Sequence, residues 1–139
     1  MCSTTSPVAI VTALKVTELV ADTPVSIVKS IKTPTEIKGM LLANLRAALC
    51  HCKLLKWVED NAGTGVTECD GSDQLAQYYA SQQDYRGQSF ETISSSGPSG
   101  SIVHYAPKRG LDRKIGNEMY LVDAGAHFTC GTTGTTVDI

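Results

Sequence analysis

The chain has 139 residues, of which 42% are hydrophobic and 19% are charged, and its formal net charge is −2. This composition is globular, and the length is enough to bury one ordinary hydrophobic core, so a single domain is the first expectation. The weak negative charge gives no broad basic surface. It therefore favours neither nucleic acid nor an anionic membrane as a partner.

The cysteines and the N-terminal segment indicate the compartment. The five cysteines (Cys2, Cys50, Cys52, Cys69 and Cys130) are odd in number and unevenly spaced, which argues against a disulfide framework and favours a reducing environment. The opening "MCSTTSPVAIVTALK" lacks a basic leading segment, so no signal peptide is predicted. No run approaches the roughly 18 apolar residues of a membrane-spanning helix. We therefore expect a soluble, cytoplasmic protein.

Residues 1–32 contain two β-branched runs, "VAIVTAL" and "PVSIVKSIK". Apolar and polar positions partly alternate in both runs, and this alternation is the period of a strand. The two runs therefore predict short strands or extended linkers.

A long helix is predicted to begin at Pro34. Thr33 is a suitable N-cap, Pro34 is suited to the first helical position, and Glu36 completes a capping box. Apolar residues then recur at steps of three and four and share one face: Ile37, Met40, Leu41, Leu45, Ala48, Leu49, Cys52 and Leu55. The pattern indicates an amphipathic helix that reaches about Asp60.

A second helix is predicted after the break at "NAGTG". Thr67 and Asp70 form a second capping pattern ahead of "DQLAQYYASQQ". Gly71 lies inside this helix, where glycine costs about 1 kcal/mol relative to alanine.

Beyond Asp84 the composition changes to serine, threonine, glycine and β-branched residues. The segment "QSFETISSSGPSGSIVHYAP" predicts two short strands joined by a "GPSG" turn, although "SSSGPSG" also fits a flexible linker. The charged "KRGLDRKIGNE" predicts a solvated connection before a final strand pair. Two helices followed by antiparallel strands make an α+β arrangement.

Several histidines and cysteines are candidates for chemistry. On a helix, Cys50 and Cys52 lie about 200° apart, so "CHC" cannot chelate one ion and indicates a core cysteine near a solvent-facing one. We expect His51 at the surface and His127 at a partly exposed strand position. His104, within the apolar "SIVHYAP", fits a core histidine with a backbone partner.

Asp123 is the most demanding residue, because "MYLV" and "AGA" flank its carboxylate. A buried carboxylate is costly unless it is paired, hydrogen-bonded or bound to metal. A turn in which Asp123 caps local amides ahead of Gly125 explains it about as well. A hard cation would require a second acid on the adjacent strand, and Asp138 is the nearby candidate.

Four segments together resemble a known family: "PTEIKGMLLANLRAALCHCKLLKWVED", "GVTE", "SFETISSSGPSGSIVHYAP" and "YLVDAGAHFTCGTT". They are similar to the front part of the catalytic domain of Xaa-Pro aminopeptidase, the cytosolic aminopeptidase P type with a pita-bread fold. The match runs from about Ser26 to the end of the chain, in the same order and with nearly the same spacing.

The resemblance implies an enzyme that removes the N-terminal residue preceding proline from a peptide. It implies divalent metal ions, commonly manganese, that activate a bridging water. It also implies that His104, in the "HYAP" motif, helps to hold the substrate, in place of the core role above. Of the family's five metal ligands, two aspartates lie on a β-hairpin, and Asp123 in "YLVDAG" matches the first.

The second aspartate can be aligned in two ways. A gapless comparison places Cys130 at the first acid of the family's "DGTTD" motif and Gly134 at the ligand position, so the second ligand is missing. If the repeat "GTTGTT" lengthens the hairpin, Asp138 becomes the ligand instead. Four additional residues preserve strand parity, so Asp123 and Asp138 would face the same side.

The remaining ligands of the family, a histidine and two glutamates, have no counterpart in the chain. We expect residues 1–25 to be the tail of a preceding domain or a linker. Residues 26–139 are expected to be the N-terminal half of a truncated pita-bread catalytic domain. The chain alone should then be inactive, with manganese or another divalent metal bound weakly or not at all. The alternatives are a noncatalytic protein-binding relative, and pairing with another copy or with a partner that supplies the missing half.

Overall fold

The computed structural model describes residues 2–3, 6–15, 19–20 and 24–139. The chain divides into two compact units, Met1–Thr35 and Glu36–Ile139. Across the described ranges, no helix has the length and apolar character needed to cross a membrane.

The described residues of the N-terminal unit form two short helices and a pair of two-residue strands. The unit contains β1 (Cys2–Ser3), α1 (Val8–Ala13), β2 (Leu19–Val20) and α2 (Pro24–Ser30), and β1 pairs with β2 in parallel. The prediction of strands or linkers for "VAIVTAL" and "PVSIVKSIK" was therefore wrong. Pro7 precedes α1 and Pro24 begins α2. Proline presets the backbone angle for a helix start, and β-branched residues lower helix propensity by only about 0.5 kcal/mol each.

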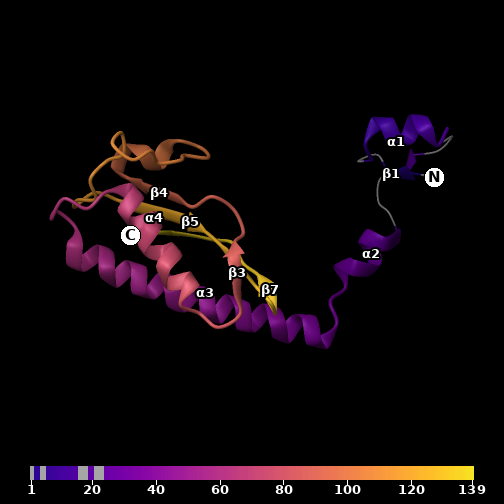
Figure 1. Ribbon diagram of the computed structural model, residues 1–139, viewed down its shortest axis with the longest axis horizontal. Coiled ribbons are helices and arrows are strands. Elements are labelled where there is room, and N and C mark those ends of the chain that lie inside the picture. The colour runs from indigo at the N-terminus through magenta and orange to yellow at the C-terminus, as the bar shows by residue number, and fades with distance from the viewer. Residues whose placement is uncertain (1, 4–5, 16–18, 21–23) are drawn as a thin grey trace. The chain divides into compact units, whose positions relative to one another are not determined.

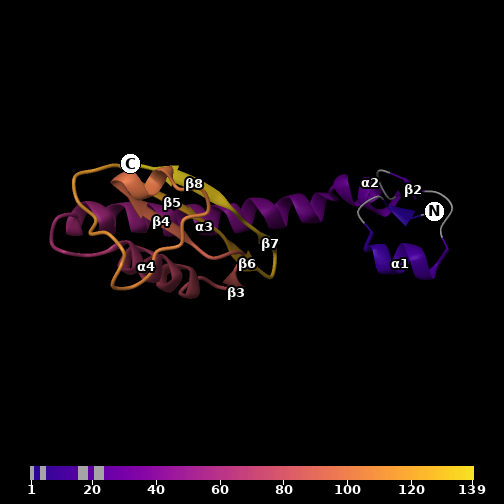
Figure 2. The same ribbon diagram turned by 90° about the horizontal axis from the view of Figure 1, so that it is seen from above.

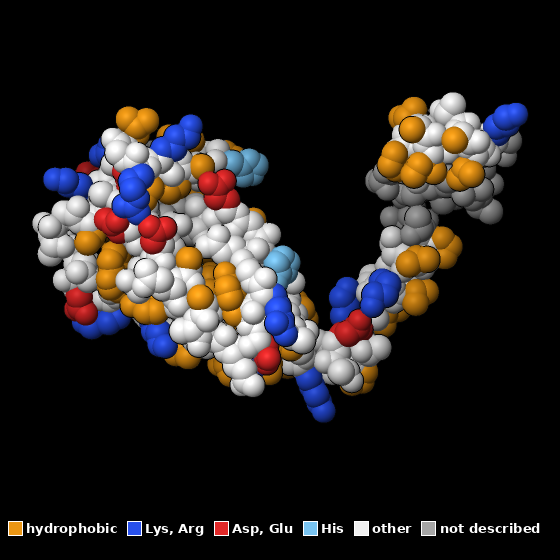
Figure 3. All heavy atoms as spheres, in the orientation of Figure 1, with side chains coloured by type: hydrophobic (Ala, Val, Ile, Leu, Met, Phe, Trp, Pro, Cys, Tyr) orange, Lys and Arg blue, Asp and Glu red, His pale blue; other side chains and the backbone are white. Residues whose placement is uncertain are grey.

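Helix α3 (Pro34–Asn61) begins where the capping pattern predicted. Its buried face is not the predicted apolar face, because the buried residues are Ala43, Ala47, Cys50, His51, Leu54 and Val58. Leu41 and Leu45 on the predicted face are 67% and 69% exposed. Figure 3 shows hydrophobic side chains along the lower edge of the C-terminal unit. The helix thus carries apolar residues on two faces, and the face that packs begins with the small residues Ala43 and Ala47 and continues with larger ones such as Leu54.

Helix α4 (Glu68–Ala80) also begins as predicted. Thr67 is its N-cap, and a complete capping box joins Thr67 to Asp70. Gly71 is buried, and a Cβ atom at this position would collide with the Tyr120 hydroxyl and lie 3.2 Å from Ser94 Oγ. The helix accepts the conformational cost of glycine there because the strands approach it too closely for a side chain.

The strands of the C-terminal unit form two small antiparallel sheets (Figure 1). One sheet has the order β3 (Tyr85–Gln88), β6 (Ala126–Phe128), β7 (Gly131–Thr132). The other has the order β4 (Ile93–Ser96), β5 (Tyr120–Ala124), β8 (Thr135–Asp138). Figure 2 shows β4, β5 and β8 side by side. This arrangement confirms the predicted α+β class with two helices followed by antiparallel strands.

The core lies between the helices and one face of the β4-β5-β8 sheet. Along β5, the buried residues Tyr120, Val122 and Ala124 alternate with half-buried ones. The three buried side chains therefore face the core. They pack in one cluster with Leu54 of α3 and Leu75 of α4. The opposite face of this sheet therefore remains available for a site.

The predicted "GPSG" hairpin was wrong. Residues Gly97–Ser101 form the 3-10 helix η1, and residues 102–106 form a turn and a loop instead of a strand. Strand β4 pairs with β5 instead. Tyr105, which a hairpin would place in the sheet, donates its hydroxyl proton to Glu68 at 2.6 Å. This contact ties the segment to the N-terminus of α4, where Glu68 also accepts a hydrogen bond from the Ser96 amide of β4.

Candidate active site

The outer face of the β4-β5-β8 sheet carries Asp123. In this sheet Asp123 lies directly opposite Ile93 on β4 and Thr136 on β8. Directly opposed residues of antiparallel strands project from the same face. The half-buried Asp123 carboxylate is therefore flanked by an apolar side chain on one side and a hydroxyl on the other.

Asp138 projects from the same face as Asp123. It lies opposite Leu121, so it is one diagonal step from Asp123, at a typical separation of about 7–8 Å. Continuation of the same register places Gly134 one diagonal step from Asp123 in the other direction. The two alternative positions for a second acid thus flank Asp123: Asp138 lies at the end of β8, and Gly134 lies just before β8 begins. The β6-β7 hairpin itself has a two-residue turn, Thr129 and Cys130.

Gly134 lies beside an aromatic side chain. A Cβ atom added at Gly134 would be 3.3 Å from Cε1 of Phe90, which is 40% exposed. A side chain added at position 134 would therefore contact the Phe90 ring, which would have to move by a few tenths of an ångström.

His104 lies in an exposed turn, so the expectation of a core strand histidine was wrong. Its φ is 55°, in the left-handed region that residues other than glycine rarely adopt, at a cost of about 1–3 kcal/mol. His104 lines a cavity of about 240 Å³ together with Phe90, Glu91, Ile93, Tyr105 and Ala106.

Ile93 connects these two features. It lines the cavity with His104, and it is also the direct cross-strand neighbour of Asp123. An imidazole, a largely apolar cavity and a carboxylate thus come together from β4, β5 and the loop after η1. Such a set can accept an apolar group and hydrogen-bond the polar atoms attached to it.

Glu68 is a buried carboxylate that sequence reasoning did not single out. Its side chain is fully buried and accepts hydrogen bonds from the Ser96 amide at 2.7 Å, the Tyr105 hydroxyl at 2.6 Å and the Arg113 amide at 2.9 Å. In the sequence, Glu68 is the first helical residue after the cap Thr67, a position where acids are common for helix-dipole reasons alone. Its long-range partners give no local signal.

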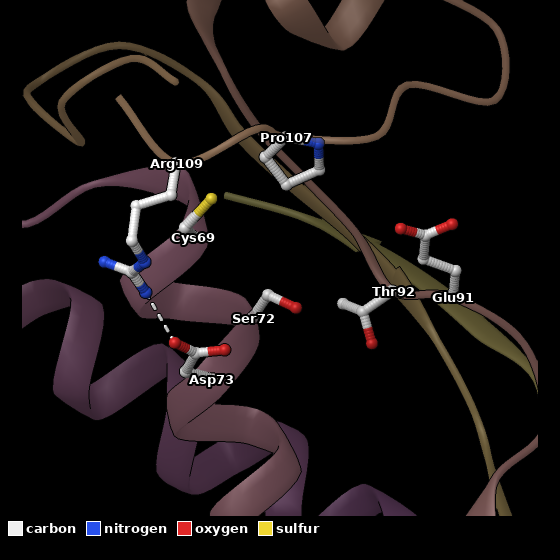
Figure 4. A pocket seen from close by; sticks show the side chains of 7 residues that line it. All are labelled: Cys69, Ser72, Asp73, Glu91, Thr92, Pro107 and Arg109. Atoms are coloured by element: carbon white, nitrogen blue, oxygen red, sulfur yellow. Dashed lines mark hydrogen bonds and ion pairs between the residues drawn. The ribbon is translucent and has the colours of Figure 1, made fainter. Parts of the chain in front are cut away.

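Charged residues fasten the loop after His104 to α4. Arg109 forms ion pairs with Asp70 and Asp73, and Figure 4 shows Arg109 reaching toward Asp73. The hydrogen bond from Arg109 lowers the pKa of Asp70. Hydrogen bonds from Thr67, Cys69 and Gly110 hold the pKa of Asp112 well below its usual range.

These ion pairs border a second cavity, of about 220 Å³, lined by Cys69, Ser72, Asp73, Glu91, Thr92, Pro107 and Arg109. Figure 4 shows how side chains of α4 face Pro107, Glu91 and Thr92 across it. The cavity thus separates α4 from the β3-β4 connection beside the site.

The other sequence candidates lie away from this face. Cys50 is buried and Cys52 is exposed, as predicted, and burial raises the pKa of Cys50 to about 11. His51 was predicted at the surface but is 5% exposed, and its Nδ1 lies 3.0 Å from the Ala47 carbonyl oxygen. Its place beside Cys50 on the packed face of α3 explains this burial. His127 is exposed on β6, as predicted.

The donor set is small. Within residues 2–3, 6–15, 19–20 and 24–139, no group of three or more histidine, cysteine, aspartate or glutamate side chains is arranged to hold a metal ion. Asp123 and Asp138 offer two carboxylates on one face, whereas hard cations take several oxygen ligands. The residues present do not fit a complete metal site.

Comparison with known proteins places these features in a family. Residues 38–139 match the model of metallopeptidase family M24. Xaa-Pro aminopeptidase ApepP of Drosophila melanogaster is 42% identical over 117 residues, which are 82% of this chain and 19% of that protein. A probable Xaa-Pro aminopeptidase P of Sordaria macrospora is 41% identical over 117 residues, 81% of this chain and 19% of that protein.

Solved structures agree with the fold. The X-prolyl aminopeptidase of Caenorhabditis elegans, described as a cytosolic enzyme with a di-nuclear active site, matches with a TM-score of 0.79 and 31% identity. The match covers 84% of this chain and 20% of that one. Escherichia coli aminopeptidase P matches with a TM-score of 0.65 at 22% identity, over 78% of this chain and 23% of that one, which supports the fold alone. The chain spans about a fifth of the length of the curated relatives it matches.

Proposed function

Because this chain belongs to metallopeptidase family M24, we propose that it is part of the catalytic domain of an Xaa-Pro aminopeptidase. Its substrate would be a peptide with proline in the second position, and the bond before that proline would be hydrolysed. Residues 26–139 would form the N-terminal part of this domain, and residues 1–25 the end of a preceding domain or a linker. The cytosolic description of the nematode relative supports a cytoplasmic location.

One observation carries the proposal: Ile93 is the cross-strand neighbour of Asp123, and it lines one cavity with His104. In this proposal His104 hydrogen-bonds the bound peptide, and the cavity beside Phe90 and Ile93 receives one of its apolar groups. Asp123 contributes a carboxylate at the position of the scissile bond.

A divalent metal, manganese or another, would activate water in such an enzyme. The described residues supply two candidate carboxylates, Asp123 and Asp138, which is fewer than a divalent cation requires. We therefore assign no catalytic step through a metal to these residues. The isolated chain should have negligible turnover, because weakly ligated metal leaves water insufficiently activated.

Two measurements on the pure 139-residue chain test this proposal. Hydrolysis of Ala-Pro-Pro should be absent with manganese present, and manganese-stimulated release of alanine would contradict the expected inactivity. Manganese should raise the melting temperature slightly, by mass action, and Asp123→Ala should abolish that rise. Gly134→Asp, which adds a third carboxylate to the same face, should enlarge it.

A second candidate function is noncatalytic protein binding. Two observations favour this function. One of the two positions that flank Asp123 is a glycine, Gly134, and α3 exposes apolar side chains. This function predicts no specific manganese effect on the melting temperature of the wild-type chain. It also predicts that Asp123→Ala and the wild type behave alike with and without the ion. Either result would favour this candidate over the enzyme fragment.

A further inference from the structure

One buried carboxylate ties the His104 loop to the start of α4. We propose that Glu68 is a positioning residue, which acts through Tyr105 to fix His104 at the cavity beside Asp123. The inference rests on the proposed substrate-holding role of His104. It adds a residue that touches neither the cavity nor the outer face of the sheet.

The Glu68 side chain is strongly restrained. Its side chain is fully buried, and its two oxygens accept the hydrogen bonds from Ser96, Tyr105 and Arg113. A buried carboxylate is costly to leave without partners, and hydrogen bonds to an ionised acceptor are about twice as strong as neutral ones. The three donor segments are therefore held to one point at the N-terminus of α4.

Tyr105 passes this restraint to His104. The two residues are adjacent in the chain, and the Tyr105 amide also donates to the Ile102 carbonyl at 3.2 Å. His104 thus lies in a tight turn whose next residue is anchored at both its backbone and its hydroxyl. Its left-handed conformation persists because the surrounding contacts over-determine it.

The same carboxylate also fixes the opposite wall of the cavity. The Ser96 amide is at the end of β4, the strand that carries Ile93. The cavity has one wall from β4, which includes Ile93, and one wall from the loop that carries His104 and Tyr105. Both walls are consequently held to the Glu68 side chain. A change at Glu68 should move both walls, whereas a change at Tyr105 should move only the loop.

Amide hydrogen exchange of the full chain, measured residue by residue by NMR, distinguishes these effects. Tyr105→Phe should accelerate exchange at the amide of residue 105 by about tenfold or more and leave the Ser96 and Arg113 amides unchanged. Glu68→Gln should accelerate exchange at all three. The controls Tyr78→Phe on α4 and Glu59→Gln, an exposed acid on α3, should change none of them.

The imidazole signals of His104 give a second readout that loss of stability alone would not move. In Tyr105→Phe they should shift or broaden at a temperature where core amides of β5 remain protected. Wild-type exchange rates at residue 105 and unmoved His104 signals in both variants would overturn the inference.

Added Ala-Pro-Pro separates this inference from the proposed function. The peptide should shift the His104 signals of the wild type, and Tyr105→Phe should weaken its binding several-fold. No shift in the wild type would contradict the substrate-holding role, while the exchange pattern would still decide whether Glu68 positions the loop. Equal binding by the wild type and Tyr105→Phe would contradict the positioning role.

Discussion

At the scale of single residues, His104 combines exposure with an unfavourable backbone angle. Its φ of 55° is a conformation that favours glycine. The sequence signal, an apolar run before a proline, predicted the wrong environment for this residue, and the substrate-holding role implied by the family resemblance stays a prediction. Periodicity reports on regular structure, and a single left-handed residue in a turn leaves no periodic trace.

This strain leads to a prediction for stability. His104→Gly should be more stable than His104→Ala by about 1 kcal/mol, because glycine relieves the left-handed strain that alanine retains. Urea denaturation of the two variants measures the difference. Both variants lose the imidazole, so the difference between their unfolding free energies does not contain the effect of that loss. Equal stabilities would mean that the loop relaxes out of the left-handed conformation in the alanine variant.

At the scale of elements, the first residues of α3 and α4 could be predicted because N-terminal capping is local chemistry between residues at most three apart. The packed face of α3 could not. The helix has apolar residues on two sides, and the side that packs contains both small residues, such as Ala43, and large ones, such as Leu54. Only the tertiary structure shows which of the two sides is packed.

The two faces of α3 should respond differently to truncation. Leu54→Ala should cost about 2–5 kcal/mol of unfolding free energy, because Leu54 is fully buried and the change leaves a cavity. Leu45→Ala removes the same atoms from a 69% exposed side chain and should change stability by less than about 0.5 kcal/mol. Thermal or urea unfolding of both variants compares them. A similar cost at both positions would show that the exposed face is covered in solution.

At the scale of the whole molecule, the α+β class followed from the order of helix-like and strand-like segments. The pairing of strands did not. Ile93 on β4 pairs with Asp123 on β5 across 30 positions, while the nearer Tyr105 lies outside the sheet and donates its hydroxyl proton to Glu68. Buried hydrogen bonds between distant residues decide such choices, and a single sequence does not display them.

Burial of thiols and phenols in the core predicts how stability depends on alkaline pH. Burial raises the pKa of Cys50 from 9.0 to about 11 and that of Tyr120 from 10.0 to about 12. The folded chain therefore holds these protons more tightly than the unfolded chain. Their contribution to stability is complete below pH 9 and declines as the pH rises through 9 toward 12.

Urea denaturation under reducing conditions from pH 7 to 11 measures this decline. Cys50→Ala should be less stable than the wild type at pH 7, because of the cavity, but its stability should fall less steeply above pH 9. Cys52→Ala changes an exposed thiol and should preserve the wild-type slope. If the stability of Cys50→Ala falls above pH 9 as steeply as that of the wild type, the Cys50 thiol is not the source of the pH dependence.

The Glu68 cluster also has a consequence for the order in which the chain folds. Its three hydrogen bonds join Glu68 to Ser96, Tyr105 and Arg113, which follow it in the sequence by 28, 37 and 45 positions. Closing such long loops costs entropy before the contacts return any energy, whereas α3 and the β6-β7 hairpin need only near neighbours. The cluster should therefore assemble late in folding. During synthesis, the Glu68 side chain stays hydrated until Arg113 has left the ribosome, because the Arg113 amide is one of its three donors.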